Sequence, residues 1–155
     1  MLRVLRDNDI DRSENVIEFA NLRAGTNWWS LFARYSDNSD GDAHLLSVTR
    51  PFYALDARWS AGGSVWQDDR QSKIYRLGEA AAEYRHERDY GYLYGGWSRG
   101  LINGRVRRWT AGVVYDDNRF SDSPSTTLNS VVPADRKLVY LLNIKDVDVF
   151  RKAKF

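Results

Sequence analysis

Residues 90–116 read YGYLYGGWSRGLINGRVRRWTAGVVYD, two stretches of strand length that are rich in aromatic and small residues and are joined at Asn103-Gly104. An Asn-Gly pair between two alternating segments predicts a β-hairpin. The reason is that a type I′ turn needs a positive φ at both of its central residues, which asparagine and glycine tolerate best. The sequence therefore predicts two antiparallel strands in this region.

The second arm of the hairpin sorts its side chains by parity. Trp109, Val113 and Tyr115 fall on one face of the strand, while Arg108 and Asp116 fall on the other. An apolar face that ends in aromatic residues suits a strand placed between lipid and a wet interior. It equally suits a half-buried strand of a soluble sheet, so other segments have to distinguish the two.

The composition describes one domain of 155 residues, of which 14% are aromatic, including six Trp and nine Tyr. Such residues are enriched in strands and in the interfacial girdles of membrane barrels. The net charge is +2, and the basic cluster Arg105, Arg107 and Arg108 is short and split between two faces. We therefore expect a solvated strand end there and no nucleic-acid partner.

Several classes of site and segment are excluded by what the sequence lacks. It has no cysteine, which excludes thiol catalysis, cysteine-based zinc sites and disulfides. No run approaches the roughly 18 apolar residues of a membrane helix. The first residues, MLRVLRDNDIDRSENVIEF, are charged throughout and do not read as a secretory signal. We expect no cofactor and no metal.

Period-two alternation recurs along the chain and predicts about seven strands in meander order. They are 27–36, 43–50, 56–68, 75–87, the two arms of the hairpin and 136–146. The stretch 75–87 also contains GEAAAEYRHE, which is rich in helix formers, so a short helix remains an alternative there.

The lengths of these segments bear on the class of sheet. Segments of about ten residues match tilted strands that cross a bilayer, whereas soluble strands are more often about five or six residues long. We predict an all-β, antiparallel up-and-down meander that is part of a transmembrane β-barrel over residues 25–155. Residues 1–24 form an N-terminal segment to which the sequence assigns no structure.

A nucleophile motif occurs in the hairpin region. Residues 96–100, GWSRG, satisfy G-x-S-x-G, in which Ser98 would be the nucleophile. That motif needs a strand, a sharp turn and a helix, with its histidine after the serine, whereas His44 and His86 both precede it. We expect no enzyme, and neither histidine has a metal-binding companion at a fixed spacing.

Two acidic groups could suggest chemistry. Asp37, Asp40 and Asp42 lie in a predicted turn, but their spacing does not match a calcium loop, so a solvated hairpin tip is expected. Glu79 and Glu83 share a face and could form a glycosidase pair, although nothing in the sequence supplies a cleft. A hydrolase using Ser98 or the glutamates is the weaker alternative.

Charged residues opposite an apolar or aromatic face would meet water in a soluble sandwich and would line the interior of a barrel. The expected interior charges are Arg58, Glu79, Glu83, Arg85, Arg108 and Asp116. The residues expected to face lipid or to form its aromatic girdle are Trp29, Tyr35, Trp59, Trp109, Val113, Tyr115 and Tyr140.

The stretch GGWSRGLINGRVRRWTAGVVYDDNRF at 95–120 resembles the barrel of the BamA/TamA-like outer-membrane proteins, the bacterial surface antigen superfamily. YSDNSDG at 35–41 is similar to an outer hairpin tip of that family, and RPFYALDARW at 50–59 to an inner turn followed by a strand. EYRHE at 83–87 and DRKLVYLLNI at 135–144 resemble its strands. Together these cover roughly residues 25–150.

The resemblance implies a segment of a bacterial outer-membrane barrel of the assembly or translocation type. Its partners would be outer-membrane lipid, other outer-membrane proteins or the remaining barrel strands. The family's V-R-G-[FY] motif and its POTRA domains have no counterpart in this sequence, so insertase activity is not implied. The main alternative is a soluble β-sandwich or small barrel that binds a ligand such as carbohydrate through its aromatics.

Overall fold

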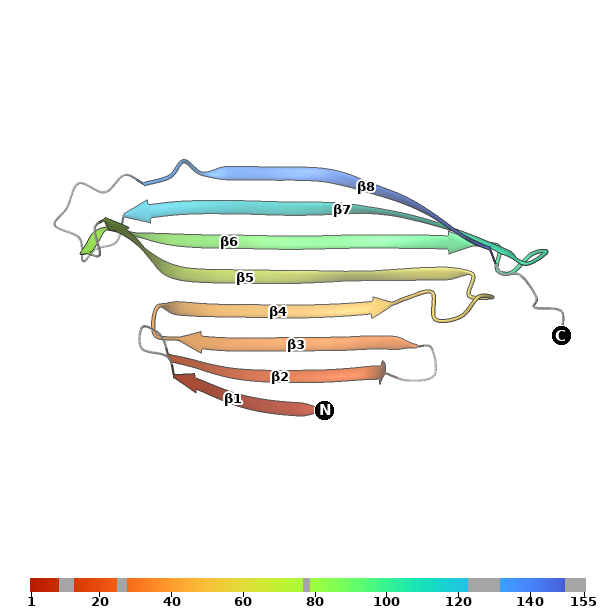
Figure 1. The fold of residues 1–155 in the computed structure, drawn as a ribbon, viewed down its shortest axis with the longest axis horizontal. Coiled ribbons are helices and arrows are strands. Elements are labelled where there is room, and N and C mark those ends of the chain that lie inside the picture. Colours follow the sequence, from red (N-terminus) through yellow and green to blue (C-terminus); the bar gives the residue numbers. More distant parts are fainter. Residues whose placement is uncertain (9–12, 25–27, 77–78, 123–131, 150–155) are drawn as a thin grey trace.

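The computed structural model describes residues 1–8, 13–24, 28–76, 79–122 and 132–149. These residues form one antiparallel sheet whose strands hydrogen-bond in sequence order from β1 to β8 (Figure 1). The strands are β1 (Leu2–Asn8), β2 (Ser13–Ala24), β3 (Trp29–Asn38), β4 (Gly41–Arg50), β5 (Trp59–Arg76), β6 (Glu79–Ser98), β7 (Arg105–Asp122) and β8 (Arg136–Val149). The predicted all-β antiparallel meander is confirmed.

The strand count of eight differs from the predicted seven for two reasons. First, the N-terminal residues form β1 and β2, which pair from Leu2 with Phe19 to Asn8 with Ser13. Second, the predicted strand 75–87 and the first arm of the hairpin are one strand, β6, of 20 residues. No glycine, proline or asparagine interrupts 83–90, so alternation continues through Arg88.

The helix alternative for 75–87 is wrong. Residues of this stretch pair with β5, for example Glu83 with Lys73 and Arg85 with Gln71. The helix propensity of Glu and Ala is a weak preference, and pairing to a neighbouring strand on each side outweighs it.

The hairpin between β6 and β7 closes on Asn103-Gly104. Asn103 has a φ of 51° and Gly104 a φ of 74°, the two positive values that a type I′ turn requires. Ile102 and Arg105 exchange both backbone hydrogen bonds, at 2.9 and 3.0 Å. The register of β6 against β7 is shifted by one residue from the one that would continue this turn. A continuous ladder from Ile102 and Arg105 would pair Trp97 with Thr110, whereas the strands pair Trp97 with Trp109.

Strands β5, β6 and β7 are much longer than their neighbours. They contain 18, 20 and 18 residues, against 10 in both β3 and β4. Their additional length extends past the β3–β4 turn, on the left in Figure 1. There β5 and β6 continue to pair as far as Arg76 with Glu79.

Figure 1 shows the described strands in a single layer, with no second sheet and no helix over either face. No helix capable of crossing a membrane occurs in the described residues. The buried apolar residues among them are few: Val16, Ala57, Val106 and Val114. A soluble domain normally buries an apolar sheet face against another layer, so the exposure of apolar side chains on this sheet is unusual for a soluble protein.

Candidate functional site

The register of the sheet places three tryptophans in one row. Trp59 pairs with Trp97, and Trp97 pairs with Trp109, so the three side chains lie next to one another across β5, β6 and β7. Trp29 extends the row, with its ring 6.1 Å from that of Trp59 in an edge-to-face contact. We call this side of the sheet the tryptophan face.

The other side carries consecutive tyrosines of β6, and we call it the tyrosine face. Tyr90, Tyr92 and Tyr94 alternate along the strand, and the rings of the last two stack at 6.0 Å. Tyr94 pairs with Gly62 on one side and with Gly112 on the other. A Cβ at Gly62 would come within 2.8 Å of the Tyr94 ring, so glycine makes room for this tyrosine.

An apolar band covers the tryptophan face. It begins at the tryptophan row and extends along the strands towards the end of the sheet that carries the β3–β4 turn. Its exposed members include Val65 at 55%, Leu93 at 64% and Trp97 at 53% of full exposure. The band consists of Trp29, Leu31, Ala33 and Tyr35 of β3, Leu46 and Val48 of β4, Trp59, Ala61, Gly63 and Val65 of β5, Gly91, Leu93, Gly95 and Trp97 of β6, Trp109, Ala111, Val113 and Tyr115 of β7, and Val139 and Leu141 of β8.

The height of the band follows from the geometry of a strand. On β7 it runs from Trp109 to Tyr115, which is about 20 Å at roughly 3.4 Å per residue. Side chains at both edges add to that height.

Arg50 of β4 lies on the tryptophan face at the height of the band, where it pairs with Ala61 of β5. It is 6% exposed, and its guanidinium lies 3.5 Å from the ring centre of Trp59 and 4.9 Å from that of Tyr53. Its Nη1 donates a hydrogen bond to the carbonyl oxygen of Trp59 at 2.5 Å. Aromatic rings therefore cover this charge.

Beyond the band, at the end of the sheet that carries the β3–β4 turn, the side chains of the same face become charged. This charged belt consists of Asp37, Asp42, Asp69, Lys73, Glu83, Arg85, Glu87, Asp89, Asp117, Arg119 and Lys137. The transition is sharp because Val65 is followed by Gln67 and then Asp69 on this face, and Tyr115 is followed by Asp117.

Basic residues of the belt are held by carboxylates of neighbouring strands. Arg85 Nε donates to Asp69 Oδ1 at 2.8 Å, and its Nη2 contacts the other oxygen. Arg119 pairs with Asp89, and Lys73 Nζ lies 3.6 Å from Glu83.

The hydrogen bonds from Arg85 lower the pKa of Asp69, and the same contact raises the pKa of Arg85. Partial burial of Asp69 opposes this effect without reversing it. Both groups are thus ionised at neutral pH.

The tyrosine face carries its own paired charges, closer to the middle of the strands. Arg88 donates to both oxygens of Asp116, at 2.8 and 3.0 Å, and its guanidinium lies 5.2 Å from the ring centre of Trp66. Arg34 Nη2 binds Glu14 at 3.0 Å across β2 and β3. Of the two pairs, Arg88–Asp116 is bidentate, a geometry that strengthens and orients a charge-assisted hydrogen bond.

Residues 51–58, between β4 and β5, fold over the tyrosine face at the tryptophan end of the sheet. Arg108 Nη2 donates to the carbonyl oxygen of Ala54 at 3.4 Å, and its guanidinium lies 5.2 Å from the Phe52 ring centre. Ser98 N donates to the carbonyl oxygen of Arg58 at 2.9 Å. This segment buries Ala57 in one of the few enclosed parts of the molecule.

The six charges predicted to share an interior face are divided in the structure. Arg108 and Asp116 lie on the tyrosine face, whereas Glu83 and Arg85 lie on the tryptophan face, in the charged belt. The prediction of one shared face is wrong for these two, because the tryptophan face changes from apolar to charged along β6. Arg58 precedes β5 and is exposed. The Glu79 side chain is outside the described residues.

Six of the seven residues predicted to face lipid lie together on the tryptophan face. They are Trp29, Tyr35, Trp59, Trp109, Val113 and Tyr115. Tyr140 is the exception, because it pairs with Val114 and so lies on the tyrosine face. Both faces of β8 are apolar there, so alternation could not orient it. Trp97 and Leu93 also lie on this face and were not predicted. The register that continues the Asn-Gly turn would place Trp97 opposite Thr110, and the one-residue shift before the turn brings it opposite Trp109 instead.

The candidate catalytic residues are not assembled. Ser98 is 1% exposed, and its Oγ accepts a hydrogen bond from Gly100 N at 3.0 Å. His86 lies 12 residues earlier on the same strand, about 40 Å away. His44 contacts Asp42 at 2.9 Å in the β3–β4 region. Within the described ranges, no cluster of three or more potential metal ligands occurs.

Comparison with models of known protein families, with curated proteins and with solved structures finds no match for this chain. The resemblance of residues 95–120 to the BamA/TamA-like barrels therefore stays a prediction.

Proposed function

We propose that this chain forms part of a transmembrane β-barrel of the bacterial outer membrane, with its tryptophan face against lipid and its tyrosine face towards the barrel interior. One observation carries the proposal. Across β3–β7, one face of the single-layer sheet bears an exposed apolar band, within which aromatic rings cover Arg50, and the band is bounded by a tryptophan row at one edge and a charged belt at the other.

The dimensions support this assignment. The apolar belt of membrane barrels is about 25 Å tall, and the band measures about 20 Å between the backbone positions of its first and last residues. Tryptophan and tyrosine are enriched at membrane interfaces because their rings are apolar and their polar groups reach the head groups. Trp97 and Trp109 occupy one such edge, and Tyr35 and Tyr115 the other.

The edges of the sheet indicate what else the barrel needs. β1 and β8 lie at opposite edges, and among the described strands neither has a partner on its outer side (Figure 1). Backbone groups left unpaired in hydrocarbon cost several kcal/mol each, so membrane sheets close. The proposed partners are outer-membrane lipid and further barrel strands.

The class of outer-membrane protein is a finer part of the proposal. The resemblance of residues 95–120 supports the assembly or translocation type, and the chain would contribute a structural wall segment. The type I′ turn and the face alternation of β7 are compatible with that role. Insertase activity is not proposed.

The proposal is tested by diluting the unfolded chain from urea into phosphatidylcholine vesicles and floating the vesicles on a density gradient. We expect the chain to float and to resist extraction by alkaline carbonate. A chain that stays monomeric in water without detergent and unfolds cooperatively would contradict the proposal. That outcome would favour the soluble, ligand-binding alternative.

A further inference from the structure

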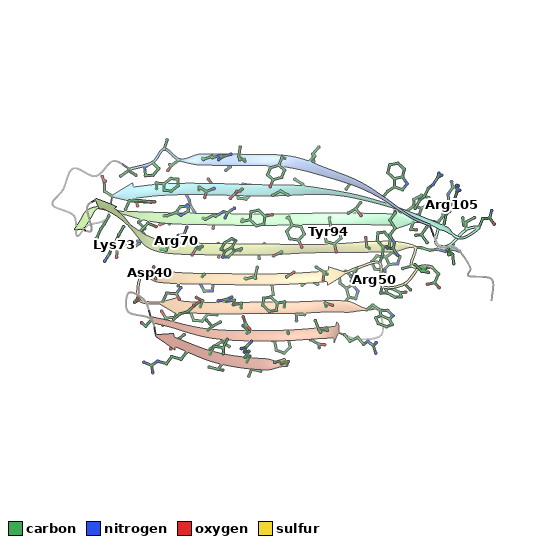
Figure 2. The ribbon with its side chains drawn as sticks, in the orientation of Figure 1. Asp40, Arg50, Arg70, Lys73, Tyr94 and Arg105 are labelled. Carbon is green, nitrogen blue, oxygen red and sulfur yellow. The ribbon has the colours of Figure 1, made fainter. Side chains whose placement is uncertain are left out.

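Three arginines lie close together on the side of the tryptophan row that faces away from the apolar band, at the end of the sheet opposite the charged belt. Arg99, Arg105 and Arg107 line a cavity of about 650 Å³ together with Trp97 and Trp109. Figure 2 shows Arg105 at this end of the sheet, far from Lys73 at the other end.

The hairpin explains why these side chains meet. Arg105, Arg107 and Trp109 alternate on β7 and therefore share the tryptophan face. The Asn-Gly turn reverses the chain and brings Arg99, two residues after Trp97, to the same place. The guanidinium of Arg99 lies 5.8 Å from the ring centre of Trp97.

These arginines differ from those of the charged belt. In the part of the chain that the structure describes, no ion pair to a carboxylate involves Arg99, Arg105 or Arg107. Arg85 and Arg119, at the other end of the same face, are each paired with aspartate. The cavity therefore presents positive charge that the described side chains do not neutralise.

We propose that this cavity binds the phosphate of an anionic phospholipid head group, with the acyl chains lying on Trp97, Trp109 and the apolar band. The inference rests on the proposed function, since it places the tryptophan row at a membrane interface. Guanidinium groups bind phosphate through paired hydrogen bonds, and basic clusters at an interface attract anionic lipid. A free phosphate ion would not need the tryptophans or the adjoining apolar surface.

The test compares lipids at the tryptophan row in vesicles that hold the full chain. Brominated acyl chains quench tryptophan fluorescence on contact, so brominated phosphatidylglycerol and brominated phosphatidylcholine report which lipid lies there. The host vesicles contain two parts of phosphatidylcholine to one of phosphatidylglycerol. We expect a preference for phosphatidylglycerol of at least about fivefold, the factor expected from one basic side chain near an anionic surface.

The variant Arg99→Gln/Arg105→Gln/Arg107→Gln should lose this preference. The matched control, Lys73→Gln/Arg85→Gln/Arg119→Gln, removes the same charge from the other end of the same face and should retain it. Equal preference in the wild type and the first variant would overturn the site. Equal loss in both variants would overturn it as well, because the attraction would then depend on net charge.

Two further measurements distinguish a lipid head group from free phosphate, and the head-group site from membrane insertion itself. Inorganic phosphate, added against chloride at equal ionic strength, should leave the preference unchanged, and its loss would point to a free-phosphate site. Flotation and quenching in pure phosphatidylcholine test the proposed function alone. If these occur without any preference for phosphatidylglycerol, only the head-group site fails. If neither occurs, both proposals fail.

Discussion

At the scale of single residues, Gly95 and Gly96 are neighbours on β6 but lie on opposite faces of the sheet. A Cβ at Gly96 would lie 2.2 Å from Ser60 Oγ and 3.0 Å from the Phe52 ring, whereas a Cβ at Gly95 would meet nothing within 4 Å. We expect Gly96→Ala to cost about 1–3 kcal/mol in the free energy of unfolding, because overpacking displaces the 51–58 segment. Urea unfolding in detergent measures this.

Gly95→Ala is the matched control and should be neutral or slightly stabilising, since glycine weakens a strand. Adding Ser60→Gly to Gly96→Ala should recover part of the loss, because it removes the nearest clashing atom. Equal effects of the two alanine substitutions would contradict the assignment of the two residues to opposite faces.

The Asp69–Arg85 pair predicts a pH dependence of stability. Arg85 lowers the pKa of Asp69 in the native state, so the pair stabilises the protein fully above the unfolded-state pKa of about 3.9. This contribution disappears as the pH falls through the lower native value. Because both side chains are substantially exposed, we expect Arg85→Gln to cost less than about 1 kcal/mol at neutral pH.

The free energy of unfolding of wild type and Arg85→Gln should therefore converge as the pH is lowered below about 3.9. Urea titrations at a series of pH values measure the difference between the two proteins. A difference that stays constant down to strong acid would show that the ion pair is not its source.

At the scale of the strand, the tryptophan face of β7 passes from the apolar band to the charged belt. Val113→Arg would place a charge within the band, and Ser121→Arg would place one on the same face beyond it. We expect a cost of about 2–4 kcal/mol for the first and about 0–1 kcal/mol for the second, as for membrane barrels. The measurement is the free energy of folding into phosphatidylcholine vesicles, and equal costs would exclude a hydrocarbon environment for Val113.

Local signals in the sequence were sufficient for the elements that depend on them. The Asn103-Gly104 pair predicted the turn, and the alternation from Trp109 to Tyr115 predicted the faces of β7. The face of Tyr140 could not be predicted, because Val139 and Leu141 on one side of β8 are as apolar as Leu138 on the other.

The faces of Glu83 and Arg85 required information on a longer scale. On the tryptophan face, their strand β6 carries apolar residues at one end and charged residues at the other. An assignment from polarity alone therefore places Glu83 and Arg85 on the wrong face. Following the alternation without interruption from Trp97 back to Glu83 would have placed them correctly. The predicted break between 87 and 90 prevented that.

At the scale of the whole molecule, the feature that supports the proposed membrane sheet over a soluble sandwich is that the described strands form a single layer. Composition and alternation are the same for both, because each has one apolar and one polar face. The described strands form one layer with the apolar band exposed. In the proposed barrel, lipid would cover this surface.

The lack of cysteine in the chain permits the most direct test of the lipid-facing assignment. Single cysteines at Thr110, Ala111, Val113, Val114, Arg119 and Ser121 would carry spin labels in vesicles. Collisions with oxygen, which dissolves in lipid, and with a water-soluble nickel chelate would be measured at each. We predict high oxygen and low nickel accessibility at 111 and 113, lower oxygen accessibility at 110 and 114, and nickel accessibility at 119 and 121. Nickel accessibility at 111 and 113 equal to that at 119 and 121 would contradict the lipid-facing assignment.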